Sequence, residues 1–142
     1  MSRILLDTNA YAALMAGDSR IADLLASSEA VLLSAVVIGE LYDGFLGGTR
    51  NLENRRVLQR FREKPRTVCV PVTEATAEWF AEIKRSLRRS GRPIPINDVW
   101  IAASCMEHGA HLLSFDSHFD DVDGLLVHLS LIPIVNTGKN ED

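Results

Sequence analysis

Cysteine and long apolar runs are scarce in this chain of 142 residues. Its two cysteines, Cys69 and Cys105, are too few and too far apart for the disulfide framework of a small secreted domain. Their apolar surroundings predict buried, reduced thiols. No apolar run approaches the roughly 18 residues of a membrane span, and the short run before Asp7 lacks the length of a secretory signal. We therefore expect a cytoplasmic protein.

The composition is that of a globular domain, with 46% apolar and 24% charged residues and little low-complexity sequence. A chain of this length is near the usual size of one domain. We expect a single domain over residues 1–135, followed by a polar, mobile tail over residues 136–142.

Short apolar segments alternate with longer segments of helical periodicity. The pattern predicts strands at 3–6, 30–34, 67–72, 111–114 and 125–129, and helices around 21–25, 35–45, 51–64, 73–90 and 98–108. We expect Leu52 and Trp79 among the inward-facing residues of their helices, and Asn97 as the N-cap of the last helix. Strands that alternate with helices imply crossover connections, and therefore an α/β fold whose mainly parallel sheet is covered on both faces.

Four acidic residues stand in special places, and three of them relate to the carboxyl ends of strands, where open α/β sheets bind ligands. Asp7 follows the first predicted strand, Asp98 begins a helix after a loop, and Asp116 follows a later strand. Glu40 interrupts the apolar start of a helix. Each acid also has an ordinary explanation: Asp7, Asp98 and Asp116 as caps or turn residues, and Glu40 as a solvent-facing neighbour of Asp43.

Carboxylates that converge on one point repel one another, and burial makes their charge more costly. Such a cluster persists only if protons or cations neutralise it. Oxygen ligands without clustered His or Cys favour hard ions, and Mg²⁺ or Mn²⁺ bound by a few carboxylates is typical of phosphate chemistry. Hydrolysis of phosphodiester bonds is therefore the leading hypothesis.

The order and spacing of four short motifs resemble those of one family. The motifs are Leu5-Leu6-Asp7-Thr8-Asn9, Glu40-Leu41, Asn97-Asp98 before Ile101-Ala102-Ala103, and Leu112-Leu113-Ser114-Phe115-Asp116. Together they span nearly the whole chain, which resembles a PIN-domain protein of the VapC type, the toxins of type II toxin–antitoxin systems. The resemblance implies a three-layer α/β/α fold, endonucleolytic cleavage of RNA with Mg²⁺ or Mn²⁺, homodimerisation, and inhibition by a cognate VapB-type antitoxin.

The resemblance also implies site residues by position. The family's acidic metal site has three main acids and a less constant fourth, which here are Asp7, Glu40, Asp98 and Asp116. Its accessory polar positions are filled by Asn9 and Ser114. We interpret Asp7 and Asp98 as the principal metal ligands, while the other two acids complete the shell or hold a second ion.

A basic stripe runs along the longest predicted helix. Residues 50–92 hold twelve of the fifteen Lys and Arg, although the net charge of the chain is −4. Five of them recur at intervals that place them along one helix: Lys84, Arg85, Arg88, Arg89 and Arg92. Contact with RNA phosphates, contact with acidic antitoxin residues, and a solvated face that offsets nearby glutamates all remain open for this stripe.

Two smaller groups of residues suggest other chemistry. Cys105, His108 and His111 lack a fourth ligand for zinc. His118 stands beside Asp116 in the sequence, where a surface turn is favoured over the role of a general base.

Two other functions remain as alternatives. A phosphatase with Asp7 as nucleophile would, in haloacid-dehalogenase-like enzymes, need a second aspartate where this chain has Asn9. A PIN domain that binds RNA or a partner without cleavage is compatible with the fold, although all four acid positions are filled.

Overall fold

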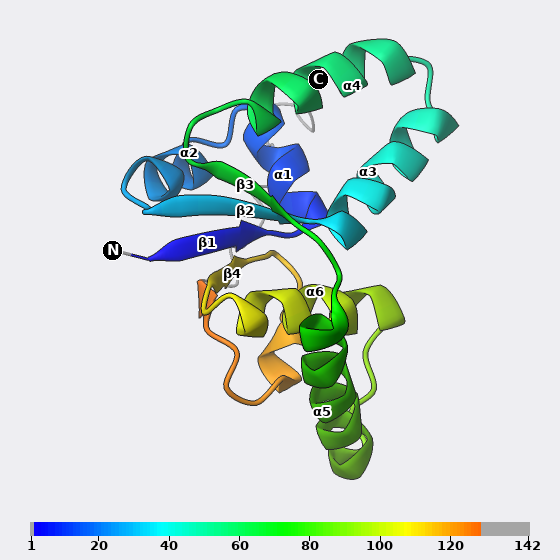
Figure 1. Cartoon of the computed structure of the whole chain (residues 1–142). Helices are drawn as coiled ribbons and strands as arrows, with labels where there is room; N and C mark the ends of the chain where they lie inside the picture. Colours follow the sequence, from blue (N-terminus) through cyan, green and yellow to red (C-terminus); the bar gives the residue numbers. More distant parts are fainter. Residues whose placement is uncertain (1, 129–142) are drawn as a thin grey trace, which may run out of the picture.

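The computed structural model describes residues 2–128, which form five strands, six α-helices and one short 3-10 helix (Figure 1). In chain order the elements are β1 (Arg3–Leu6), α1 (Thr8–Met15), α2 (Ser19–Ala26), β2 (Ala30–Ser34), α3 (Ala35–Gly47), α4 (Asn51–Arg62), β3 (Thr67–Val70), α5 (Glu74–Ser90), α6 (Ile96–Glu107), β4 (His111–Leu113), η1 (Ser117–Asp121) and β5 (Val127–His128). The predicted tail at 136–142, and the end of the predicted domain beyond residue 128, lie outside the described residues. Within residues 2–128, no helix is long and apolar enough to cross a membrane.

Neighbouring strands of the sheet are all parallel, in the order β3-β2-β1-β4-β5. The chain builds outward from β1 through β2 to β3, and then returns to the other side of β1 to add β4 and β5. The direction of growth therefore reverses between β1 and β4. In open α/β sheets, ligands bind at such a reversal, beside the carboxyl ends of the strands.

Helices cover both faces of this sheet. Crossovers between parallel strands are almost always right-handed, so the reversal of growth is expected to put the helices before β3 on one face and α5 with α6 on the other. Figure 1 shows the division, with α1, α3 and α4 above the sheet and α5 packed against α6 below it. The expected α/β fold with a parallel sheet is confirmed, in a three-layer form.

The central strands are short and apolar because both of their faces are buried. Ile4, Leu5 and Leu6 of β1 are at most 1% exposed, and Leu112 and Leu113 of β4 are fully buried. Polar residues that directly follow these strands are therefore held at one edge of the best-buried part of the molecule.

Polar and aromatic contacts join α5 to α6. The rings of Phe80 and Trp100 stack with their centroids 3.9 Å apart and an interplanar angle of 21°. The buried hydroxyl of Thr76 donates to Oε1 of Glu107 (2.5 Å) and accepts a hydrogen bond from the backbone amide of Thr73 (3.0 Å). The hydrogen bond to Glu107 holds the beginning of α5 against the end of α6, and the stacked rings join the two helices nearer their middles.

The predicted start of α6 is wrong. Pro95, not Asn97, takes the N-cap position, and its carbonyl oxygen accepts hydrogen bonds from the amides of Asp98 (3.0 Å) and Val99 (3.2 Å). Proline suits the beginning of a helix because its φ is already close to the helical value and its missing N–H has no helical partner there. The side chain of Asn97 makes a different contact, described below.

Three other side chains are more exposed than predicted. Leu52 is 69% exposed because the first turn of α4 extends beyond the core, and Trp79 is 39% exposed at the edge of the face of α5 that buries Ile83. Cys69 is half-buried rather than buried, and its Sγ accepts a hydrogen bond from Nε of Arg62 (3.2 Å). Sequence periodicity identifies the inward face of a helix but not how far the core reaches along it.

The substitution Thr76→Val tests the polar join between α5 and α6. It preserves the shape of the side chain but removes the hydroxyl that donates to Glu107. We expect the free energy of unfolding, measured by urea titration, to fall by about 1–3 kcal/mol. Thr49→Val, at an exposed position between α3 and α4, is the matched control and should change stability by less than about 0.5 kcal/mol. Equal stability of the two variants would contradict this account.

Candidate metal centre

Asp7 lies directly after β1 and caps α1. Its Oδ1 accepts a hydrogen bond from the backbone amide of Ala10 (2.8 Å). Its Oδ2 accepts a hydrogen bond from the hydroxyl of Ser114 (2.5 Å), 107 positions later in the chain. The residue is only 6% exposed. Oδ1 of Asp7 therefore caps α1, while Oδ2 is bound by Ser114, which follows β4.

Ser114 links Asp7 to the acid that follows β4. Its buried hydroxyl donates to Asp7 and accepts a hydrogen bond from the backbone amide of Asp116 (2.9 Å). Asp116 caps η1, since its Oδ1 accepts a hydrogen bond from the amide of His118 (2.9 Å). Because β1 and β4 are neighbours, both acids lie at the point where the growth of the sheet reverses.

Glu40 reaches the same edge of the sheet from α3. Ser34, at the end of β2, caps this helix by accepting a backbone hydrogen bond in its first turn (3.1 Å). Further along α3, Oε1 of Glu40 accepts from the hydroxyl of Thr8 (2.5 Å) and Oε2 from Nδ2 of Asn97 (3.3 Å). Glu40 is thus held between α1 and α6, whereas Asp43 is exposed.

Asp98 lies in the first turn of α6, close to Asp116 and His118. Nδ1 of His118 is 3.0 Å from Oδ1 of Asp116 and 3.6 Å from Oδ2 of Asp98. One possible ligand atom from each of these three residues lies within 4.8 Å of the others. The surface turn predicted for His118 is confirmed, since its side chain is 50% exposed in η1. Its contact with Asp98 was not predicted, because that contact depends on how α6 sits beside β4.

Two of the acids, Asp7 and Asp98, have a raised pKa. Burial raises the pKa of Asp7, against hydrogen bonds that lower it, and the charges of Asp98 and Asp116 add to the rise. Burial also raises the pKa of Asp98, reinforced by the charges of Asp116 and Glu40 and opposed by His118. The fully ionised cluster is therefore unfavourable by itself, as expected of a site that binds a cation.

The donor atoms suit a hard divalent ion. Carboxylate oxygens are the ligands that Mg²⁺ and Mn²⁺ prefer, and they predominate at this edge of the sheet. Among the described residues, the imidazole that joins this group of possible ligands belongs to the exposed His118. The residues present therefore fit the divalent ion that the sequence resemblance implies.

The other predicted residues lie on α1, on α5 and near the end of α6. Asn9 is exposed in the first turn of α1. The basic stripe follows α5 and extends to Arg92, whose Nη1 is 3.2 Å from Oδ1 of Asp121. Burial raises the pKa of Cys105 to about 12, and its thiol donates to the carbonyl of Ala110 (3.0 Å). Within residues 2–128, none of the three residues considered for zinc belongs to a group of possible metal ligands.

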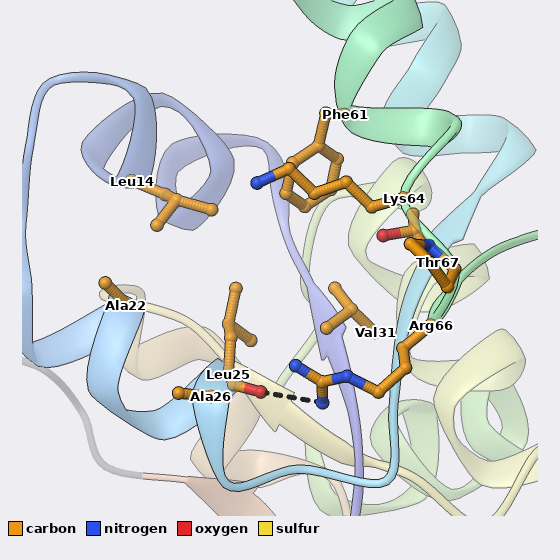
Figure 2. A pocket seen from close by; sticks show the side chains of 10 residues that line it. Leu14, Ala22, Leu25, Ala26, Val31, Phe61, Lys64, Arg66 and Thr67 are labelled. Atoms are coloured by element: carbon orange, nitrogen blue, oxygen red, sulfur yellow. Dashed lines mark hydrogen bonds between the residues drawn. The ribbon is translucent and has the colours of Figure 1, made fainter.

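A groove opens on the face covered by α1, α2 and α4, with a volume of about 500 Å³. Its apolar lining includes Leu14, Leu25, Val31 and Phe61. Figure 2 shows these side chains around the groove, with Lys64 and Arg66 beside them. Nη1 of Arg66 donates to the carbonyl oxygens of Leu25 (3.1 Å) and Ser28. The groove lies by the amino-terminal ends of β2 and β3, at the opposite edge of the sheet from the acids.

The chain matches known proteins over most of its length. A family model described as the PIN domain matches residues 4–125. Ribonuclease VapC4 of Mycobacterium tuberculosis is 32% identical over 93 residues, which cover 61% of this chain and 67% of that protein. Ribonuclease VapC5 of the same organism is 28% identical over 119 residues, which cover 84% of this chain and 87% of that protein.

A similar solved structure is that of VapBC-5 from Mycobacterium tuberculosis, described as a member of the VapBC family of toxin–antitoxin systems. The TM-score is 0.69 at 24% sequence identity, and the match covers 91% of this chain and 100% of that chain. A likeness at this identity concerns the fold, and it agrees with the parallel, three-layer arrangement. Because the family match spans residues 4–125 and the fold agrees with it, the chain belongs to the PIN-domain family.

Proposed function

We propose that the chain is a divalent-metal-dependent endoribonuclease and the toxin of a toxin–antitoxin pair. The observation that carries the proposal is the convergence of four acids at the point where the sheet reverses: Asp7, Glu40, Asp98 and Asp116. The two relatives named as ribonucleases support RNA as the substrate. Cleavage of a phosphodiester builds negative charge, which a carboxylate-held divalent ion offsets.

Asp7 and Asp98 are the proposed principal ligands. Burial and neighbouring negative charge raise the pKa of both, and a nearby cation would favour their ionised forms. Glu40 and Asp116 complete the shell or hold a second ion. When bound, Mg²⁺ or Mn²⁺ would offset charge on the scissile phosphate and lower the pKa of a water molecule. No side chain of the protein is then needed as a nucleophile.

Polar neighbours orient these acids. Ser114 fixes one oxygen of Asp7 and so sets the direction of the carboxylate. Asn9 is exposed at the start of α1, where we propose that it contacts the substrate. His118 lies against Asp116 and Asp98, and it orients Asp116 through the Nδ1 contact of 3.0 Å. Such partners of metal ligands tune both affinity and geometry.

RNA is a polyanion, so it needs positive charge near an acidic site. The basic stripe on α5 supplies this charge, and the loop after α5 leads directly to Asp98. We assign phosphate contacts to its five members, which are Lys84, Arg85, Arg88, Arg89 and Arg92. Phosphate contacts of this kind add affinity that weakens as salt rises.

A segment of a VapB-type antitoxin is the proposed occupant of the groove in Figure 2. The apolar lining suits the apolar face of an amphipathic helix, and Lys64 and Arg66 suit acidic residues beside that face. The solved relative from a toxin–antitoxin system supports such a partner. The proposal also includes a homodimer and a cytoplasmic location, as the sequence resemblance implies.

The acid assignments are tested by RNA cleavage. We expect Asp98→Asn to lower the rate of Mg²⁺- or Mn²⁺-dependent cleavage by on the order of a hundredfold, because a principal ligand is lost. Cleavage is measured by mapping new 5′ ends in total cellular RNA, and EDTA should abolish it. Glu40→Gln should also lower the rate, whereas Asp43→Asn, an exposed acid on the same helix, should retain wild-type activity.

Full activity of Asp98→Asn in a preparation free of contaminating nuclease would overturn the assignment of this acid. Absence of cleavage by folded, metal-loaded wild-type protein without antitoxin would favour the non-catalytic alternative.

The raised pKa of Asp98 predicts that its charge destabilises the metal-free fold at neutral pH. The folded-state pKa lies above the unfolded-state value, so stability falls as pH rises from the unfolded-state pKa through the folded-state pKa. Asp98→Asn removes this titration. In EDTA at about pH 7, the variant should therefore have a higher Tm than wild type, and the difference should shrink near roughly pH 3. A lower Tm for the variant at neutral pH would contradict the prediction.

The substitution Ala26→Glu tests the groove. Ala26 is exposed and lines the groove from α2. An added carboxylate disrupts the apolar lining and repels acidic partner residues, so inhibition should require at least about tenfold more purified cognate antitoxin. RNA cleavage by the chain alone should not change. Ala81→Glu, at an exposed position on α5, is the control, and equal inhibition of both variants would count against this site.

A further inference from the structure

A second cavity lies between the last turns of α5 and the beginning of α6. Its volume is about 360 Å³, within the usual range for small-ligand pockets. Leu87 of α5 and Val99 of α6 are buried in its floor, at 3% and 2% exposure. Pro93 and Ile94, from the loop between the two helices, line another side. The cavity is therefore an apolar slot rather than a polar cleft.

Two charged side chains line this slot in the part of the chain that the structure describes, and both are positively charged. Lys84 and Arg88 are four residues apart on α5, so they lie on the same face of the helix. Both belong to the basic stripe on α5, which thus borders the slot. Apolar walls with cations at one side suit a ligand that has a flat apolar body and an anionic group.

The slot and the acidic cluster both use side chains from the beginning of α6. Ile96 and Val99 line it, and both lie within two residues of Asp98. Ile96 is 48% exposed, so this wall of the slot is open to solvent. A ligand in the slot would therefore lie beside the helix turn that presents Asp98.

We propose that this slot binds one unpaired nucleotide of an RNA strand, with the base against the apolar walls and a phosphate against Lys84 and Arg88. The inference rests on the proposed function in taking RNA as the ligand, and it adds a base-binding position outside the acidic cluster. A base enters the slot only if it is not paired, so the nucleotide held there belongs to an unpaired stretch of the strand. Single-strand binding commonly combines a cationic groove with aromatic side chains on which the bases stack. In this slot, aliphatic side chains and Pro93 would take the place of the aromatic surface.

The test compares two RNA probes with the same number of phosphates. One is a fluorescein-labelled uridine 12-mer, and the other is the matching abasic ribose-phosphate 12-mer. Binding to the full chain is measured by fluorescence anisotropy in EDTA, where the proposed cleavage does not occur. We expect wild-type protein to bind the uridine strand about tenfold more tightly than the abasic strand. A uridine strand paired with its complement should lose this advantage.

Variants then test whether the preference for the base-bearing strand depends on the slot. Ile96→Ser removes an exposed wall of the slot and should reduce the preference for the base-bearing strand to about twofold or less. Leu52→Ser, at an exposed aliphatic residue on α4 that does not line the slot, should retain it. Lys84→Gln with Arg88→Gln should weaken binding at least about threefold more than Arg85→Gln with Arg89→Gln, although both pairs remove two positive charges from α5.

Equal binding of the uridine and abasic strands by wild-type protein would overturn the inference. So would an unchanged preference in Ile96→Ser, with folding checked by circular dichroism. A change of sedimentation in Ile96→Ser without loss of the preference would assign the slot to contact between copies of the chain instead. Because no step of this test uses cleavage, failure of the ribonuclease assay and failure of the slot are separate results.

Discussion

The repulsion among carboxylates at the carboxyl edge of the sheet is the interaction on which the rest of the structure depends. Asp7 is buried where β1 and β4 end, and both burial and the neighbouring acids oppose its charge. A carboxylate in such a place must be held by hydrogen bonds, which come from Ser114 and from the first turn of α1. The same side chain therefore caps a helix and forms part of the proposed metal site, so neither role can be changed alone.

The positive charge on the surface of the protein would balance the acidic cluster. An acidic edge attracts a divalent ion but repels RNA, and the cations that would offset this repulsion are concentrated on α5. The loop that follows α5 leads into α6, whose first turn carries Asp98. Opposite charges are thus brought to neighbouring parts of the molecule by two helices that pack against each other.

Much of the fold and of the site could be predicted from the sequence, because buried parallel strands are short apolar runs that end at polar residues. Asp7 and Asp116 were recognisable in this way, and Glu40 by its place in an apolar helix. The contacts of Asn97 with Glu40 and of His118 with Asp98 were not predictable, because they depend on the packing of separate elements.

The spacing of apolar residues also did not predict which residues along a helix are exposed to solvent. Leu52 has the spacing of a core residue, but the core ends before the first turn of α4. Pro95, rather than Asn97, is the N-cap of α6 because its carbonyl oxygen accepts the first backbone hydrogen bonds of the helix. Asn is a favoured capping residue, but this preference alone does not fix where the helix begins.

The hydrogen bond between Ser114 and Asp7 also determines when the site comes into existence. The two residues are 107 positions apart, and β4 enters the sheet beside the first strand of the chain. Protein synthesis runs from the N-terminus, so a growing chain contains Asp7 and Glu40 long before it contains Asp116. The acidic cluster is completed by almost the last described element, and an unfinished copy of the chain therefore lacks it.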